Sequence, residues 1–297
     1  IYTDTVQWII LFSGLIFLAI PFAVSRVGGF SKLVEKVPSE FFSLTNIGWV
    51  QFFNWMITIV PIWFVAMTIY QRIYASRGEK EAKRAWYIGG IFEYPLMAFT
   101  GVFLGICARA LFTGIDAEMG VPLLIRDVLP VGVAGIITAA YFSAIMSTAD
   151  SCLMASSSCF VNDLVCKYFI KQPGAKKMLR LSQLATLGIG LAALTIAVSF
   201  KSVLDAILHA YSFMVSGLLV PTFAAFFAKK CHSNAALWSM LSGGTTSVVM
   251  KIFSIQLPYG IDQTVAGILI SLAVYLLLAT ESQKKEKPFE SKRERFT

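Results

Sequence analysis

The chain is dominated by long, almost uncharged apolar runs, and this feature restricts its fold more than any other. The hydrocarbon core of a bilayer is about 30 Å thick, and a helix needs about 20 apolar residues to cross it. We expect spans at residues 5–25, 46–71, 86–112, 131–164, 178–200, 203–228, 234–254 and 261–280. The runs are continuous rather than alternating, which favours helices over the strands of a closed barrel. The sequence therefore predicts an all-α integral membrane protein with about eight transmembrane helices.

The distribution of charge agrees with a membrane location. Charged residues make up 14% of the 297 positions, compared with about 25% in a typical soluble domain. Most of the 25 Lys and Arg residues follow the second, fourth and sixth expected spans or lie in residues 281–297. Loops rich in these residues face the cytoplasm. We therefore expect a plasma (inner) membrane protein with a cytoplasmic C-terminus, and Asp4 near the cytoplasmic mouth.

The same pattern predicts the domain organisation. Residues 1–280 form one transmembrane region, and residues 281–297 form a charged cytoplasmic tail that we expect to be disordered. The chain starts at Ile1, directly in an apolar run, and we expect it to be truncated at its N-terminus.

Residue content argues against several functional classes. The basic residues lie in loops and in the tail, so the net charge of +8 does not indicate nucleic-acid binding. Five cysteines and two histidines without paired spacing predict neither a disulfide framework nor a transition-metal site. The sequence contains no nucleophile–base pair and no cofactor motif, so we do not expect an enzyme.

Helix-breaking residues fall inside three of the expected spans. Pro61 lies in the second span, Gly217 and Pro221 in the sixth, and Gly243–Gly244 in the seventh. Transporters use discontinuous helices at binding sites near the bilayer midplane. Gly and Pro are also frequent in ordinary membrane helices, where they serve packing. Both interpretations stay open for each of these positions.

The fourth expected span carries a polar stripe. Ala144, Ser147, Thr148 and Ser151 are spaced i, i+3, i+4 and i+7, which puts them on one face of a helix, and Asp150 flanks that face. A carboxylate at membrane depth usually has a partner or a function. Hydroxyl, carbonyl and carboxylate oxygens suit hard cations. The stripe predicts a cation site, and Na⁺, a proton on Asp150 and a cationic substrate all remain candidates.

Three segments carry a resemblance to a known family. The motif AAYFSAIMSTADS at residues 139–151 resembles the signature helix of the sodium:solute symporter family. The opening YTDTVQ at residues 2–7 resembles the start of an earlier core helix of that family, and Gln71–Arg72 with its basic loop resembles its QR segment. The resemblance covers nearly the whole chain apart from the tail.

The resemblance implies a fold and a main ion site. It implies part of a LeuT-like inverted-repeat transporter core, beginning at the fifth core helix, with two peripheral helices. The first core helix, which supplies half of the main sodium site, is then absent from this chain. The family's main sodium site uses a carbonyl and two hydroxyls of the signature helix, which match Ala144, Ser147 and Thr148.

The resemblance also implies a second cation position and an activity. Some family members look to have a further position nearer the cytoplasm, whose ligands match Asp4, Ser147, Asp150 and Ser151. The implied activity is sodium-coupled symport of a small organic solute by alternating access. Sodium is the coupling ion, and the solute, the ion and the bilayer are the partners. The alternative is a symporter-like sensor module of a signalling protein.

A solute cavity is expected beside the second span. Trp63 and Phe64 follow the breaker Pro61, and Glu93 lies in the third span. The sugar-transporting branch of the family resembles this region poorly, because its members have an amide at the position of Ala66 and a lysine near Glu93. An acid in place of a base suggests an amine-bearing or cationic solute. The alternatives are that the aromatic residues anchor at the membrane interface and that Glu93 pairs with a basic loop residue.

Overall fold

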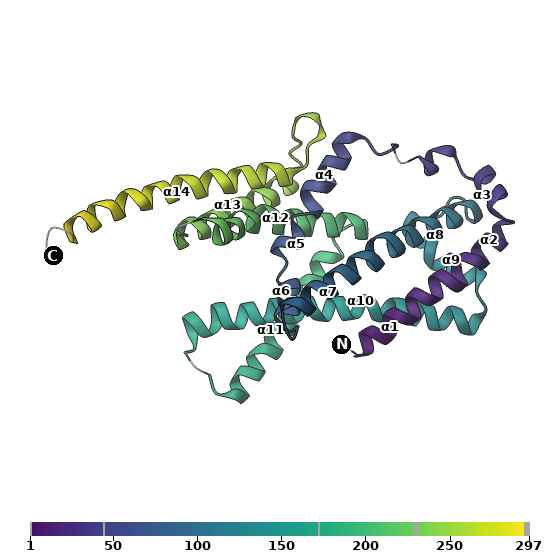
Figure 1. Cartoon of the computed structure of the whole chain (residues 1–297), viewed down its shortest axis with the longest axis horizontal. Helices are drawn as coiled ribbons and strands as arrows, with labels where there is room; N and C mark the ends of the chain where they lie inside the picture. The colour runs from purple at the N-terminus through teal and green to yellow at the C-terminus, as the bar shows by residue number, and fades with distance from the viewer. Residues whose placement is uncertain (1, 44, 172, 229–230, 294–297) are drawn as a thin grey trace. The chain divides into compact units, whose positions relative to one another are not determined.

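The computed structural model describes residues 2–43, 45–171, 173–228 and 231–293, with side chains from residue 3 to residue 280 within these ranges. Within these ranges the regular structure is entirely helical, which confirms the predicted class (Figure 1). The chain divides into two compact units. The first unit comprises Ile1–Asn46 and Tyr70–Ser199, and the second unit comprises Ile47–Ile69 and Phe200–Thr297.

The first unit contains the fourth expected span and the helices around it. Its first segment forms α1 (Tyr2–Ser13), η1 (Gly14–Ala19), α2 (Ile20–Val27), α3 (Phe30–Lys36) and η2 (Ser39–Phe42). Its second segment forms α7 (Glu79–Ile91), η3 (Phe92–Met97), α8 (Ala98–Leu111), η4 (Ala117–Met119), α9 (Gly120–Val128), α10 (Val131–Cys159), η5 (Phe160–Phe169) and α11 (Ala175–Ala197). Here η1, η3 and η5 are π-helical, whereas η2 and η4 are 3₁₀-helical.

The core of the first unit joins α1 and η1 to α10. Leu11, Leu15 and Ile137 are buried in the same apolar cluster. The two segments approach closely at Gly14, where an added Cβ would lie only 2.7 Å from Cγ1 of Ile137. Real Cβ atoms do not come this close to another atom, so the absence of a side chain at Gly14 allows the contact. This packing holds α1 against the polar helix α10.

The second unit begins with a broken helix. Its elements are α4 (Trp49–Ile59), α5 (Ile62–Val65), α6 (Met67–Tyr74, whose end belongs to the first unit), α12 (Val203–Phe227), α13 (Ser233–Ile252), η6 (Pro258–Gly260) and α14 (Gln263–Arg293). Of the two interpretations left open for Pro61, a break holds, because α4 ends at Ile59 and Pro61 is the N-cap residue of the short helix α5. A second break follows at Ala66, which is extended (φ −71°, ψ 112°).

The other expected breakers serve packing. Both α12 and α13 are continuous through Pro221 and Gly243–Gly244. An added Cβ at Gly243 would overlap the carbonyl of Ser216, and one at Gly267 would lie 2.5 Å from Cβ of Ser216. Small residues let membrane helices approach closely. Of the two interpretations left open for Gly243–Gly244, packing therefore holds, in a tight three-helix contact of α12, α13 and α14.

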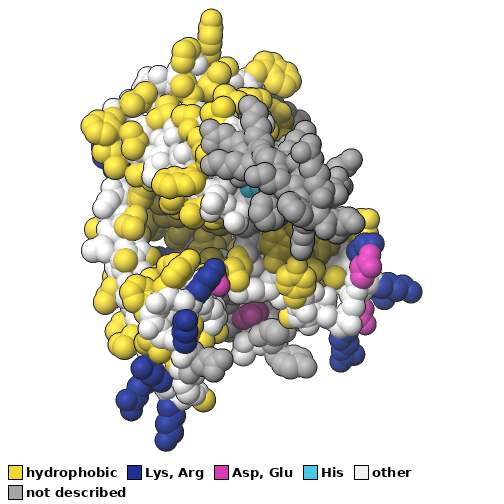
Figure 2. Space-filling view, turned by 90° about the vertical axis from the view of Figure 1, so that its left-hand side faces the viewer, with side chains coloured by type: hydrophobic (Ala, Val, Ile, Leu, Met, Phe, Trp, Pro, Cys, Tyr) yellow, Lys and Arg dark blue, Asp and Glu magenta, His cyan; other side chains and the backbone are white. Residues whose placement is uncertain are grey.

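Seven of the described helical segments are long and apolar enough to cross a membrane. They correspond to the expected spans apart from residues 234–254. That span forms α13, whose 20 residues include several Ser, Thr and Gly, so it is less apolar than the others. Figure 2 shows hydrophobic side chains over much of the face that it presents. Exposed apolar side chains are what contact with lipid requires, because lipid tails are themselves apolar.

The last helix is longer than expected. We expected disorder from residue 281 onward, whereas α14 continues to Arg293. Extending an existing helix needs no new nucleus and is therefore much easier than starting one. Residues 294–297 lie outside the described part of the chain.

Candidate functional site

The polar stripe lies on α10. The hydroxyls of Ser147 and Thr148 each donate to the carbonyl oxygen of Ala144, at 3.2 Å in both cases. One turn further along, Ser151 donates to the carbonyl of Ser147 at 2.9 Å. Three oxygen atoms, Ala144 O, Ser147 Oγ and Thr148 Oγ1, therefore gather at one point of the helix surface.

These three oxygens have the chemistry of a hard-cation site. A hydroxyl that donates its proton still has two acceptor lone pairs, so both side chains can also face a cation. Hard cations such as Ca²⁺ and Mg²⁺ take about six to eight oxygen ligands, so three oxygens make up only part of a shell. Among the described residues, no group of three or more His, Cys, Asp and Glu side chains is placed to hold a metal ion.

Asp4 lies on the helix that packs against this stripe. The helices α1 and α10 are in contact and run in opposite directions (Figure 1). Asp4 precedes Gly14 by ten residues, and Ser147 follows Ile137 by ten residues. Ten residues correspond to about 15 Å along either helix. Since Gly14 and Ile137 touch, the antiparallel register puts Asp4 level with Ser147.

Asp150 and Ser151 continue the stripe by one turn. Asp150 is exposed and Ser151 is partly buried, and both belong to the same unit as Asp4. The first unit thus brings the expected ligands of both cation positions onto two packed helices.

Two of the expected solute-cavity residues lie in the second unit. Trp63 and Phe64 are exposed side chains of α5, between the two breaks. The ring of Phe64 packs against the ring of Phe223, with centroids 5.7 Å apart. These aromatic residues therefore flank backbone that leaves the regular helical hydrogen-bond ladder.

Glu93, the third expected cavity residue, lies in the first unit. It is an exposed side chain of the π-helix η3, which contains Pro95. Proline lacks the N–H that would bond four residues back, and this explains the local widening of the helix. The three side chains therefore belong to two different units.

Comparison with known sequences decides which family these helices represent. The sequence model of the sodium:solute symporter family matches residues 1–243, which include α1 and the whole of α10. The chain belongs to the sodium:solute symporter family. The resemblance carried by residues 139–151 is therefore confirmed. The family consists of transporters rather than enzymes, and its name implies sodium as the coupling ion.

Curated relatives within the sodium:solute symporter family carry different solutes in their names. The sodium/sialic acid symporter of Proteus mirabilis is 25% identical, over 80% of this chain and 52% of its own. The sodium/glucose cotransporter of Vibrio parahaemolyticus is 25% identical, over 92% of this chain and 57% of the cotransporter. The sodium/pantothenate symporter of Haemophilus influenzae is 27% identical, over 93% of this chain and 59% of that symporter. The chain spans about half the length of the curated relatives it matches.

Gln7 is a residue of this sodium:solute symporter chain that the sequence argument missed. Its Oε1 atom is buried and has no hydrogen-bond partner among the described residues. Gln7 follows Asp4 by three positions, so both lie on one side of α1. A buried oxygen without a donor carries a desolvation cost. The YTDTVQ motif contains Gln7, but its burial depends on neighbouring helices and gives no signal in the sequence.

Proposed function

We propose that this chain forms the sodium-binding part of a symporter that moves a small organic solute together with Na⁺. The observation that carries the proposal is the group of three oxygens on α10, within the region matched by the family. The names of the relatives support sodium coupling, and their variety leaves the solute open.

In this proposal the carbonyl of Ala144 and the hydroxyls of Ser147 and Thr148 bind the main sodium ion. Further ligands come from outside α10, because three oxygens do not complete the shell of a hard cation. A second cation position uses Asp4, Asp150 and Ser151. The negative charge of the two carboxylates offsets the charge of the ion, and the register of α1 against α10 supports this pairing.

Transport then follows alternating access between outward-open and inward-open states. Inward movement of one sodium ion supplies about 2.3 kcal/mol per 100 mV of membrane potential. The solute binds beside the breaks that flank α5, near Trp63 and Phe64. Glu93 favours an amine-bearing or cationic solute. The protein lies in the plasma (inner) membrane with its C-terminus in the cytoplasm, as the distribution of Lys and Arg indicates.

The test is uptake by the full-length protein in proteoliposomes. A panel of radiolabelled amines, amino acids, sugars and carboxylates is offered with and without an inward sodium gradient. We expect sodium-driven uptake of at least one solute, and its loss in the double variant Ser147→Ala/Thr148→Ala. Ser157→Ala is the matched control, because Ser157 also donates to a carbonyl of α10, that of Met154 at 3.2 Å. An uptake rate that is the same with and without the sodium gradient, and the same in the wild type and the double variant, would refute the proposal.

A further inference from the structure

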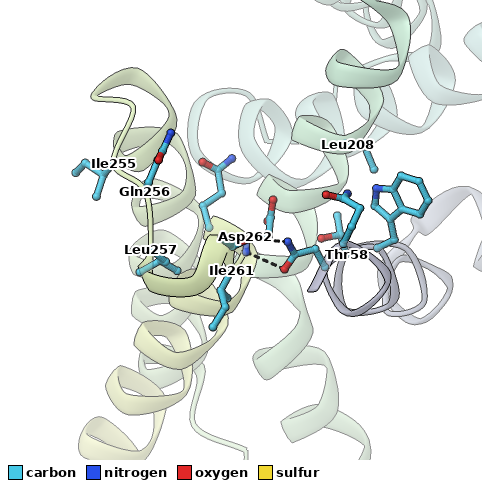
Figure 3. Close-up of a pocket in the computed structure, with 12 residues that line it drawn as sticks. Thr58, Leu208, Ile255, Gln256, Leu257, Ile261 and Asp262 are labelled. Atoms are coloured by element: carbon cyan, nitrogen blue, oxygen red, sulfur yellow. Dashed lines mark hydrogen bonds between the residues drawn. The ribbon is translucent and has the colours of Figure 1, made fainter. Parts of the chain in front are cut away.

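A polar cavity lies wholly within the second unit and uses none of the proposed sodium ligands. Its volume is about 440 Å³, within the range of roughly 300–1,000 Å³ typical of small-molecule sites. Its lining comes from α4, α12 and the segment between α13 and α14 (Figure 3). The polar side chains that line it are Gln51, Asn54, Trp55, Thr58, Gln256, Asp262 and Gln263.

The wall of the cavity is held in place by Asn54. Its side-chain amide donates to the carbonyl of Gly260 and accepts from the backbone N–H of Asp262, both at 2.9 Å (Figure 3). Asn54 is only 8% exposed, and both bonds are partly buried. They fix the segment before α14 against α4, and the cavity is therefore largely formed before any ligand arrives.

A hydrogen-bond network also fixes the carboxylate of Asp262. The backbone N–H of Thr264 donates to Oδ1 at 2.8 Å, and the Thr264 hydroxyl donates to the same oxygen. The Thr264 hydroxyl lies 3.1 Å from that of Thr58 and 2.9 Å from that of Ser212. Asp262 precedes α14 and caps its first turn. The two hydrogen bonds from Thr264 both end on Oδ1 of Asp262 and hold the carboxylate in place. The Asp262 side chain lines the cavity.

The charge of the lining selects the class of ligand. Asp262 is the only ionised side chain among the twelve lining residues, and no Lys or Arg lies among them. The start of α14 offsets about half a charge, which leaves a net negative environment. An anion would face this carboxylate and find no positively charged side chain in the lining. A cation finds a carboxylate together with the side-chain oxygens of Gln51, Gln256 and Gln263.

Trp55 indicates two further properties of the ligand. Its Nε1 atom is buried and has no hydrogen-bond partner among the described residues, and a buried donor without an acceptor is costly. A ligand that carries an acceptor oxygen would satisfy it. The indole ring is also the best aromatic partner for organic ammonium groups.

We propose that this cavity binds a small organic ammonium ion that also carries a hydroxyl or carbonyl oxygen. Asp262 and the ring of Trp55 receive the ammonium group, and the indole N–H donates to the oxygen. The alternative, that Asp262 only caps α14, makes a different prediction for Asp262→Asn. Asparagine caps a helix as well as aspartate does, so this variant keeps the structural role and removes only the charge.

The test measures equilibrium binding to the full-length protein in nanodiscs, without sodium and at constant ionic strength. The probe is choline, and the comparison ligand is 3,3-dimethylbutan-1-ol, which has the same shape and hydroxyl but no charge. We expect the wild type to bind choline at least tenfold more tightly than the alcohol. Asp262→Asn should lower choline affinity about tenfold or more, and Trp55→Phe should lower it less while keeping the aromatic ring.

The controls separate the cavity from the fold and from the sodium site. Asp205→Asn removes an acidic side chain of the same unit that does not line the cavity, and it should leave choline affinity unchanged. Ser147→Ala/Thr148→Ala should also leave it unchanged. Thermal unfolding checks that each variant is folded. Absence of choline binding to the wild type, equal binding of the alcohol, or full choline affinity in folded Asp262→Asn would each overturn the proposal.

Discussion

The side-chain oxygen of Asn54 accepts a 2.9 Å hydrogen bond from the backbone N–H of Asp262, across 208 positions of the sequence. With the bond from Asn54 to the carbonyl of Gly260, this contact ties the segment before α14 to α4. The two partners are backbone groups, so any substitution that removes the amide of Asn54 leaves them without their present partner.

Asn54→Ala should therefore destabilise the second unit. The variant removes two partly buried hydrogen bonds, each of which contributes about 0.5–1.5 kcal/mol to stability. We expect the midpoint of thermal unfolding in detergent to fall by several degrees. Gln51→Ala, on the same helix but exposed, should change the midpoint little. An unfolding midpoint for Asn54→Ala equal to that of the wild type would show that water replaces both bonds.

The glycine contact of α12, α13 and α14 should tolerate no added side chain. Gly243→Ala puts a Cβ onto the carbonyl of Ser216, and overpacking of this kind costs about 1–3 kcal/mol. Gly101→Ala is the control, because nothing lies within 4 Å of an added Cβ there. It should stabilise α8 by roughly 0.5–1 kcal/mol through its higher helix propensity. Thermal unfolding of the two variants should move in opposite directions.

The hydroxyl of Thr148 should be required for tight sodium binding. We expect Thr148→Ala to raise the sodium concentration for half-maximal uptake at least tenfold, because one of three recorded oxygens is lost. Thr148→Ser keeps the hydroxyl and should stay within a few-fold of the wild type. The measurement is initial uptake against sodium concentration. If the alanine and serine variants showed the same dependence of uptake on sodium concentration, the Thr148 hydroxyl would not be a sodium ligand.

The second cation position predicts a change in stoichiometry. Asp4→Asn and Asp150→Asn remove carboxylates from α1 and α10 without changing side-chain size much. Each should lower the number of sodium ions moved per solute, measured from the reversal potential of uptake in proteoliposomes. If both variants kept the sodium affinity and stoichiometry of the wild type, the second cation position would be wrong.

Glu93 predicts selectivity for solute charge. If its carboxylate faces the solute, Glu93→Gln should weaken uptake of a cationic or amine-bearing solute about tenfold or more. Uptake of a neutral analogue of similar shape should change much less. The comparison uses competition by both solutes at fixed sodium concentration. A preference for an anionic solute that survives the substitution would contradict this role for Glu93.

Much of the fold was accessible from the sequence. The apolar runs predicted the helices. Seven of the expected spans match helical segments long and apolar enough to cross a membrane, and the eighth, residues 234–254, corresponds to α13. The spacing of Ser147, Thr148 and Ala144 predicted a shared face, and the structure joins these residues by hydrogen bonds. Glycine and proline were less informative. Pro61 follows the end of α4, whereas Gly243–Gly244 do not interrupt α13, because their role is set by the neighbouring helices.

The sequence by itself determined the helical class, the family and the polar face of α10, because hydropathy and i, i+3, i+4 spacing are local properties of the chain. Only the tertiary structure decided that Asn54 reaches Asp262, that Oε1 of Gln7 is buried with no hydrogen-bond partner in the described part of the chain, and that Gly243 meets Ser216. Each of these depends on how helices distant in sequence pack together. That packing is set by the shapes of many side chains at once, and no short stretch of sequence contains it.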